Sequence, residues 1–171
     1  MKIGFFGDGP WSHKSLKLLL DNDDFEVAFV CVRFDPGDEH LIEIARQESI
    51  PILQNKDINS KEFLSALSSY SCDIFVSLAF NQIFKKHLIQ LPSLGIINCH
   101  AGKLPEYRGR NILNWALIND EKEFGITVHY VDEGIDTGDI ILQKIFKIDD
   151  SDTYKSLLEV CLLYTSPSPR D

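Results

Sequence analysis

Short apolar runs alternate with stretches of helical periodicity through the first hundred residues of this 171-residue chain. The runs are rich in Ile, Val and Phe, as buried strands are, and lie at residues 2–6, 26–32, 74–79 and 95–99, with a short one near Ile52. Leucines at helical spacing separate the first two runs, and Asn59 with Glu62 predicts a helix cap further on. This alternation predicts an α/β fold: a Rossmann-like, mostly parallel sheet with helices on both faces.

The second half of the chain continues the pattern. Residues 111–119 predict a helix, and residues 125–131 and 140–146 predict two strands around the segment GIDTGD. A last helix start at residues 151–153 runs into a small, polar segment with two prolines, which cannot continue a helix. We therefore expect a single domain over residues 1–160 and a truncated or non-native tail over residues 161–171.

Polar side chains gather where the strand at residues 95–99 ends. Asn98, Cys99 and His100 are followed by a loop that contains two glycines and a proline, so the strand stops there. In open α/β sheets ligands bind at the carboxyl ends of strands. Strand alternation places Asn98 and His100 on one side and Cys99 on the other. The GIDTGD turn is expected to bring Asp136 back to the same edge, so that an amide, an imidazole and a carboxylate meet.

These three groups suit the transfer of an acyl group to an amine. When an amine attacks a carbonyl carbon, negative charge develops on the oxygen, and the Asn98 amide is a donor for that oxygen. His100 can donate to the same oxygen or relay a proton, while Asp136 can orient the imidazole and accept the proton of the amine. This chemistry requires no metal, and we expect none.

Each residue also has an ordinary structural interpretation. A single Asn or His at a strand end usually caps a loop, and Asp136 on its own is a turn former. The thiol of Cys99 is expected to point away from His100 and to be a small buried hydrophobe rather than a nucleophile. Only the joint pattern favours catalysis.

The joint pattern resembles that of a known family, the 10-formyltetrahydrofolate-dependent formyltransferases. Its parts are Asn-Cys-His at residues 98–100, Leu-Pro-Glu-Tyr-Arg-Gly at residues 104–109 and Asp-Thr-Gly at residues 136–138. The family includes methionyl-tRNA, glycinamide ribonucleotide and sugar N-formyltransferases. The resemblance implies that residues 1–160 are a formyltransferase catalytic domain, with Asn98, His100 and Asp136 as catalytic residues and 10-formyltetrahydrofolate as formyl donor.

The resemblance also implies which residues contact the two substrates. The folate would contact the end of the strand at 74–79 and the GIDTGD turn, through Leu78, Phe80, Asn81, Ile83, Thr137, Gly138 and Asp139. The acceptor would contact the turn after the first strand and the signature loop, through Gly9, Trp11, Ser12, Tyr107 and Arg108. From the residues alone, G-x-G in that first turn is a weak signal for phosphate binding and is usually only a tight connection. Likewise, residues 78–83 alone predict only ordinary core and loop, and Asp139 alone predicts a structural turn residue. His129 alone predicts a half-buried histidine in a strand.

The net charge of the chain bears on which kind of acceptor it can bind. The net charge is −9, and the loop at residues 33–39 is acidic, whereas proteins that hold tRNA usually present a basic patch to its phosphates. The segment after the signature loop, with Trp115 and EKEFG at residues 121–125, looks most like sugar N-formyltransferases. We therefore expect a small-molecule amine acceptor, an amino sugar linked to a nucleotide, and no nucleic acid partner. The alternatives are a methionyl-tRNA formyltransferase, a hydrolase that releases formate from the folate, and a non-catalytic fragment. The sequence leaves open whether the chain forms a homodimer.

The four cysteines lack CxxC spacing, which suits a reducing compartment. The apolar run at the amino terminus is too short and too interrupted for a signal peptide, and no run is long enough to span a membrane. The sequence thus predicts a cytoplasmic protein without a membrane partner.

Overall fold

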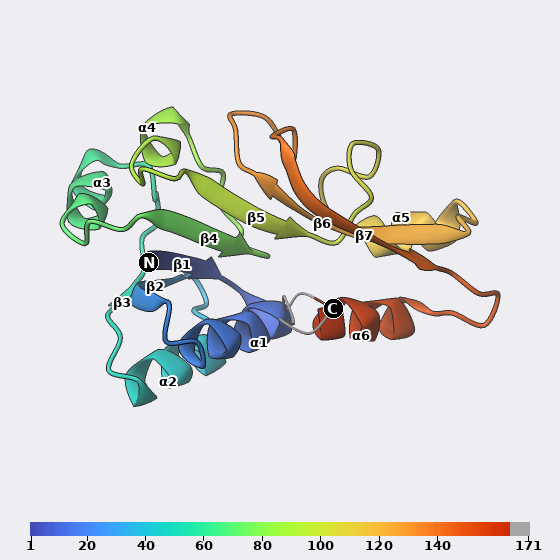
Figure 1. The fold of residues 1–171 in the computed structure, drawn as a ribbon, viewed down its shortest axis with the longest axis horizontal. Helices are drawn as coiled ribbons and strands as arrows, with labels where there is room; N and C mark the ends of the chain where they lie inside the picture. Colours follow the sequence, from blue (N-terminus) through green and yellow to red (C-terminus); the bar gives the residue numbers. More distant parts are fainter. Residues whose placement is uncertain (165–171) are drawn as a thin grey trace.

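The structure, a computed structural model, describes residues 1–164. Strands and helices alternate through most of the chain (Figure 1). In chain order they are β1 (Lys2–Gly7), α1 (Gly9–Leu20), β2 (Glu26–Val32), α2 (Glu39–Gln47), β3 (Ile52–Leu53), α3 (Lys61–Ser68), β4 (Ile74–Leu78), α4 (Lys86–Ile89), β5 (Ile96–His100), α5 (Ile112–Ile118), β6 (Glu123–Tyr130), β7 (Ile140–Lys147) and α6 (Tyr154–Tyr164).

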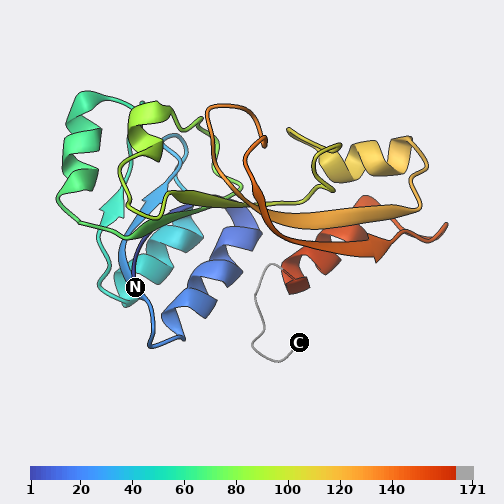
Figure 2. The same ribbon diagram turned by 45° about the horizontal axis from the view of Figure 1, so that its top comes forward.

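The described strands form one sheet in the order β3-β2-β1-β4-β5-β6-β7. Pairing is parallel from β3 to β5 and antiparallel from β5 through β6 to β7. Helices α1, α2 and α6 lie on one face of the sheet, and α3 and α4 lie on the other (Figures 1 and 2). Helix α5 packs against α6 and β6. The prediction of a Rossmann-like, mostly parallel sheet with helices on both faces is confirmed. Because β1 is flanked by β2 on one side and β4 on the other, the order in which successive strands are added to the sheet reverses there. In parallel sheets such a reversal leaves a crevice at the carboxyl ends of the strands.

Three apolar clusters hold the helices to the sheet. In the first, the ring of Phe6 lies 5.5 Å from Phe29, 5.3 Å from Phe75 and 5.2 Å from Phe84, in tilted or edge-on contacts. The second cluster packs α1 and α2 against β1 and β2. The third packs α5 and α6 against β6, so the antiparallel strands carry a core of their own. The strand ends are therefore fixed from both faces.

Local details differ from the sequence prediction. The cap of α3 is Ser60, whose hydroxyl accepts a hydrogen bond from the Phe63 amide (3.4 Å). The Asn59 side chain instead forms hydrogen bonds with the backbone of the loop before α4. Helix α4 is short, and the periodicity of the sequence did not predict it. At the other end of the chain, α6 extends to Tyr164 and its Cys161 is buried. The rest of the predicted tail, residues 165–171, lies outside the described residues.

Candidate active site

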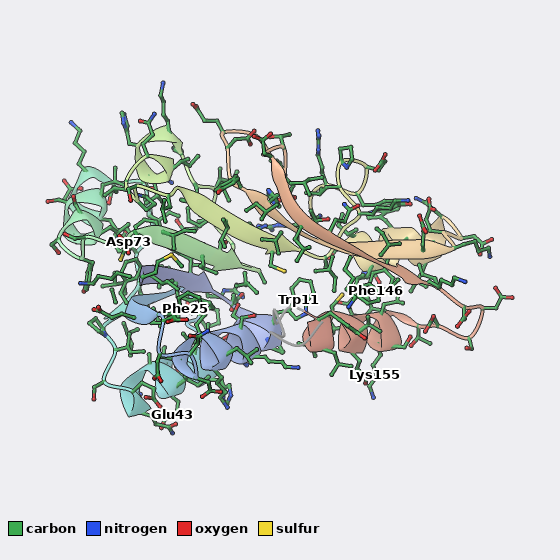
Figure 3. All side chains as sticks on the ribbon, viewed as in Figure 1. Trp11, Phe25, Glu43, Asp73, Phe146 and Lys155 are labelled. Atoms are coloured by element: carbon green, nitrogen blue, oxygen red, sulfur yellow. The ribbon has the colours of Figure 1, made fainter. Side chains whose placement is uncertain are left out.

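A cavity of about 980 Å³ lies at the carboxyl ends of β4 and β5. Its size and its mixture of apolar walls and polar groups are those of a small-molecule site. Seven of the site residues expected from the sequence line it: Trp11, Phe80, Asn81, Ile83, Asn98, His100 and Asp136. The other eight do not lie on its wall: Leu78, Thr137, Gly138, Asp139, Gly9, Ser12, Tyr107 and Arg108. Figure 3 shows Trp11 at the start of α1, beside α6.

The Asp136 carboxylate lies between two histidines. Its Oδ2 atom is 3.6 Å from Nδ1 of His100, and its Oδ1 atom is 3.4 Å from Nε2 of His129. The backbone N–H of Gly109, in the signature loop, donates to Oδ2 at 2.8 Å. Asp136 has a φ of 51°, in the left-handed region, which Asp tolerates better than most residues. The turn therefore places the carboxylate beside the end of β5, as the motif predicted.

The protons on both imidazoles are fixed by carbonyl groups. Nε2 of His100 lies 2.6 Å from the carbonyl oxygen of Tyr107, and Nδ1 of His129 lies 2.8 Å from that of Tyr130. Since a carbonyl oxygen only accepts, each of these nitrogens must carry a hydrogen. Nδ1 of His100 and Nε2 of His129 are therefore the atoms that turn toward Asp136.

The pairing of β5 with β6 orients Asn98. Asn98 lies opposite His129 in the antiparallel register, and its Nδ2 is 3.3 Å from Nε2 of His129. Within residues 1–164 the Asn98 amide makes no other hydrogen bond, and Asn98 lines the cavity. The amide nitrogen is therefore placed to donate to a ligand atom.

Burial and hydrogen bonding set the charge states. Burial lowers the pKa of His100 below its ordinary value; the Asp136 carboxylate and the Tyr107 carbonyl oppose this effect without reversing it. Burial alone would raise the pKa of Asp136, but the hydrogen bond from His129, the charge of His100 and the Gly109 N–H together bring it below the ordinary value. At neutral pH the site therefore holds a neutral His100 beside an ionised Asp136.

Cys99 does not belong to this group of reacting side chains. Although it also borders the cavity, it packs against the second and third apolar clusters. Burial raises the pKa of its thiol to about 12, so the thiol is protonated at neutral pH. This agrees with the expectation that it is a packing residue.

Two contacts fix the loop between β5 and α5, which follows His100. The hydroxyl of Tyr107 donates to the Glu121 carboxylate at 2.6 Å and accepts from the Asn119 amide at 3.2 Å. A Cβ atom added to Gly102 would lie 2.3 Å from the Tyr107 carbonyl oxygen and 2.4 Å from Nε2 of His100, so only glycine fits. The Tyr107 side chain thus holds the backbone that fixes His100.

His129, which the sequence predicted to be a half-buried strand histidine, joins the group around Asp136. Only 1% of its surface is exposed, and it contacts both Asn98 and Asp136. The prediction of a strand residue is correct, but the side chain is fully buried rather than half-buried, and its contacts were not predicted. The signal lies in the register of two strands that are far apart in sequence, which no local pattern contains.

Two further features concern the described residues only. Residues 1–164 contain no cluster of three or more His, Cys, Asp or Glu side chains arranged to bind a metal ion. None of the helices in that part of the chain is both long and apolar enough to traverse a bilayer.

Comparison with known proteins points to one family. Residues 1–162 match the family described as formyl transferase. Methionyl-tRNA formyltransferase from Clostridioides difficile is 35% identical over 161 residues, which cover 90% of this chain and 52% of that protein. The enzyme of the same name from Clostridium tetani is 36% identical over 160 residues, covering 90% of this chain and 52% of the relative. This chain therefore spans about half the length of these relatives.

Comparison with solved structures leads to the same family. Glycinamide ribonucleotide transformylase 1 from Symbiobacterium toebii has a TM-score of 0.83 and 26% identity, with 97% of this chain and 82% of that chain covered. WlaRD, a sugar 3N-formyl transferase solved with dTDP and 5-N-formyl-THF, has a TM-score of 0.72 and 27% identity, with 97% of this chain and 59% of the other covered. The shared fold and the match over almost the whole length show that the chain belongs to the formyl transferase family, whose enzymes use a formyl-tetrahydrofolate donor.

Proposed function

We propose that this domain moves a formyl group from 10-formyltetrahydrofolate to a primary amine at the cavity beside β5. The observation that carries the proposal is the contact group of one amide, two imidazoles and one carboxylate, joined by distances of 3.3–3.6 Å on a cavity wall. Asn98, His100 and Asp136 are the proposed catalytic residues, and His129 orients two of them.

The Asn98 amide would stabilise the charge that develops on the formyl oxygen. The amide is carried by strand β5, so it need not reorganise when the amine attacks. Donors of this kind contribute about a hundredfold to a thousandfold to turnover in acyl transfer. His129 supports this role because its Nε2 lies 3.3 Å from the amide nitrogen of Asn98 and so limits the rotation of the amide.

Asp136 and His100 would transfer the proton that the attacking amine loses. In the reaction the bond between the formyl carbon and the folate nitrogen breaks, a bond to the amine nitrogen forms, and one proton passes from the amine to the folate nitrogen. The His100–Asp136 separation of 3.6 Å is too long for a direct hydrogen bond. A water molecule or the amine itself, contacting both groups from the cavity, can connect them, so that Asp136 accepts the proton and His100 relays it.

The cavity fits a folate donor. Phe80 and Ile83, in the loop after β4, and Val131 and Ile135, in the loop before β7, supply apolar surface for a flat ring system. Polar backbone at residues 79–83 borders the same space. The bound folate supplies the activated formyl group, and the residues of this chain hold it against Asn98.

For the acceptor, the relatives support methionyl-tRNA better than the amino sugar that charge and the 121–125 segment favoured. Both relatives named above are methionyl-tRNA formyltransferases, and this chain spans only about half of each. We therefore take methionyl-tRNA as the first acceptor to test. The amino sugar stays as a second candidate because the sugar 3N-formyl transferase is a structural neighbour at 27% identity and because this chain is acidic, with a net charge of −9.

One experiment separates the acceptors. The full-length protein is incubated with 10-formyltetrahydrofolate and methionyl-tRNA, nucleotide-linked amino sugars or glycinamide ribonucleotide, and the N-formyl product is measured at several salt concentrations. A tRNA acceptor should show a steep loss of affinity with salt because each neutralised phosphate releases counterions. Formate release without any N-formyl product would refute transfer and favour the hydrolase alternative.

A further inference from the structure

A row of side chains that crosses three strands holds the loop between β5 and α5 from the sheet. His100 on β5 lies opposite Thr127 on β6, and Thr127 lies opposite Gln143 on β7. Residues directly opposite one another in antiparallel strands project from the same face of the sheet. The three side chains therefore share one face, and two of them contact the loop that follows His100.

Thr127 and Gln143 bind the loop through its carbonyl groups. The Thr127 hydroxyl donates to the carbonyl oxygen of Gly102 at 2.6 Å, and Nε2 of Gln143 donates to that of Leu104 at 2.8 Å. Nε2 of Gln143 also donates to the hydroxyl oxygen of Thr127 at 2.9 Å. Thr127 is 0% exposed, so no solvent can replace the Gly102 carbonyl as the partner of its hydroxyl. The two side chains thus form one buried polar group that fixes the start of the loop.

The part of the loop that this group holds leads to the carbonyl group that contacts His100. The N–H of Tyr107 donates to the carbonyl oxygen of Lys103 at 3.1 Å, and Lys103 lies between the two residues that are held. The carbonyl oxygen of Tyr107 in turn lies 2.6 Å from Nε2 of His100. A displacement of the loop at Gly102 or Leu104 would therefore move the acceptor that keeps the hydrogen on this nitrogen.

An exposed ion pair also joins this loop to β6. Nζ of Lys103 bonds the carboxylate of Glu123, and the two side chains are 37% and 45% exposed. Exposed pairs of this kind contribute little to stability, because water and salt screen them. The same loop is thus joined to the same strand by a buried neutral group and by an exposed ionic one.

We propose that Thr127 and Gln143 are positioning residues for His100. They hold the loop so that the Tyr107 carbonyl keeps the hydrogen on Nε2, which leaves Nδ1 without a hydrogen and facing Asp136. The consequence for catalysis rests on the proposed formyl transfer, in which His100 relays a proton. The consequence for the imidazole does not depend on that function.

The variants remove the donor groups and keep the shapes of the side chains. Thr127→Val replaces the hydroxyl with a methyl group, and Gln143→Met replaces the amide with an unbranched apolar chain. Gln143 is only partly buried and lies on the last strand of the sheet, so Gln143→Met keeps the test decisive if Thr127→Val folds poorly. Thr127→Ser is the conservative variant because it keeps the hydroxyl. Glu123→Gln is the matched control because it weakens the exposed link of the same loop.

The position of the hydrogen on His100 is measured by NMR of protein with 15N-labelled histidine, at about pH 8, where an ordinary imidazole is neutral. We expect the hydrogen on Nε2 in the wild type, Thr127→Ser and Glu123→Gln. In Thr127→Val and Gln143→Met we expect a mixture of tautomers, because the Asp136 carboxylate faces Nδ1 and favours a hydrogen there once the hold on Nε2 is weakened. An unchanged tautomer in both variants, even with lowered stability, would overturn the proposal, and so would an equal change in Glu123→Gln.

Formyl transfer by the same proteins tests the consequence for catalysis. A catalytic group that is misplaced by about 1 Å can cost about a hundredfold, so we expect kcat to fall about tenfold to a hundredfold in Thr127→Val and Gln143→Met, with the KM of the folate and both rates of the comparison variants changed less than about threefold. A changed tautomer with normal kcat would overturn the role in catalysis. A wild type that formylates no acceptor would refute the proposed function instead, while the NMR measurement, which needs no turnover, would still decide whether Thr127 and Gln143 position His100.

Discussion

Replacing Asp136 with asparagine removes the charge that joins the two histidines while the shape of the side chain stays the same. The amide oxygen of the introduced side chain can still accept the hydrogen bond that the Gly109 N–H donates at 2.8 Å. Asparagine also tolerates the left-handed backbone that this position adopts, with φ at 51°. We therefore expect the free energy of unfolding at pH 7 to fall by no more than about 1.5 kcal/mol, the scale of one perturbed hydrogen bond.

The effect on turnover should be far larger. Asp136 is the only carboxylate among the proposed catalytic residues, and positioned proton-transfer groups contribute about a hundredfold to ten-thousandfold. We expect kcat to fall at least about a hundredfold, with the dissociation constant of the folate changed less than about threefold. The carboxylate also raises the pKa of His100 against the effect of burial, so its loss should lower that pKa further. Any limb of the pH–rate profile that reports His100 should then move to lower pH.

The assay is single-turnover formyl transfer measured across pH 5–9, with chemical denaturation of the same samples as the stability control. Glu133→Gln is the matched variant, since Glu133 is an exposed carboxylate in the same loop. A kcat within about threefold of the wild type in Asp136→Asn would refute the proton-transfer role. Equal losses in Glu133→Gln would show that the charge of the loop, and not the position of Asp136, matters.

The packing around the site leads to three further predictions. Gly102→Ala should abolish turnover, because its Cβ would collide with the carbonyl of Tyr107 and with His100; a crystal structure of an active alanine variant with an unmoved loop would contradict this. Cys99→Ala should retain turnover within about threefold, since the pKa of the thiol, raised to about 12, excludes a thiolate nucleophile; a formyl group trapped on the Cys99 sulfur during turnover would show otherwise. Because the pKa of His100 is lowered on folding, the unfolded state binds more protons, so the free energy of unfolding should fall as pH drops below about 6.5. Urea denaturation should show a weaker dependence between pH 7 and 5 in His100→Gln than in the wild type.

Sequence patterns predicted the parts of the site that depend on local order. The run that ends in Asn98 and His100 is a strand followed by a glycine-rich loop, so strand alternation alone oriented both side chains correctly. The glycine-rich turn around Asp136 indicated a chain reversal toward the same edge, as the structure places it. Apolar runs likewise predicted the parallel half of the sheet, because buried parallel strands are continuous hydrophobic segments in sequence.

What local patterns missed depends on contacts between distant segments. His129 enters the site through the register of β6 on β5, and that register is set by the cores on both faces of the sheet. Asp38 was one acidic residue in a charged loop, although it accepts bonds from two helix N-termini. Ser60 and Asn59 are equally good caps by type, and the choice between them follows from the bonds of Asn59 to the loop before α4.

The acceptor was the least predictable feature. Net charge describes the whole surface, whereas recognition of tRNA or of a sugar depends on a few side chains near the cavity. The acidic composition pointed to a sugar, and the relatives point to methionyl-tRNA. The fold is shared by solved enzymes that are named for different acceptors, so the fold does not decide between them.

Single-turnover transfer of a radiolabelled formyl group from 10-formyltetrahydrofolate to the active acceptor, in Asn98→Ala, His100→Gln and the double variant, tests the catalytic role of the β5 end most directly. Each single variant should lose at least about a hundredfold in rate while binding the folate, and the double variant should lose far less than the product of the two, because residues that act as a unit are not additive. Near-normal transfer in either single variant, with the label still appearing on the acceptor amine, would place the chemistry elsewhere.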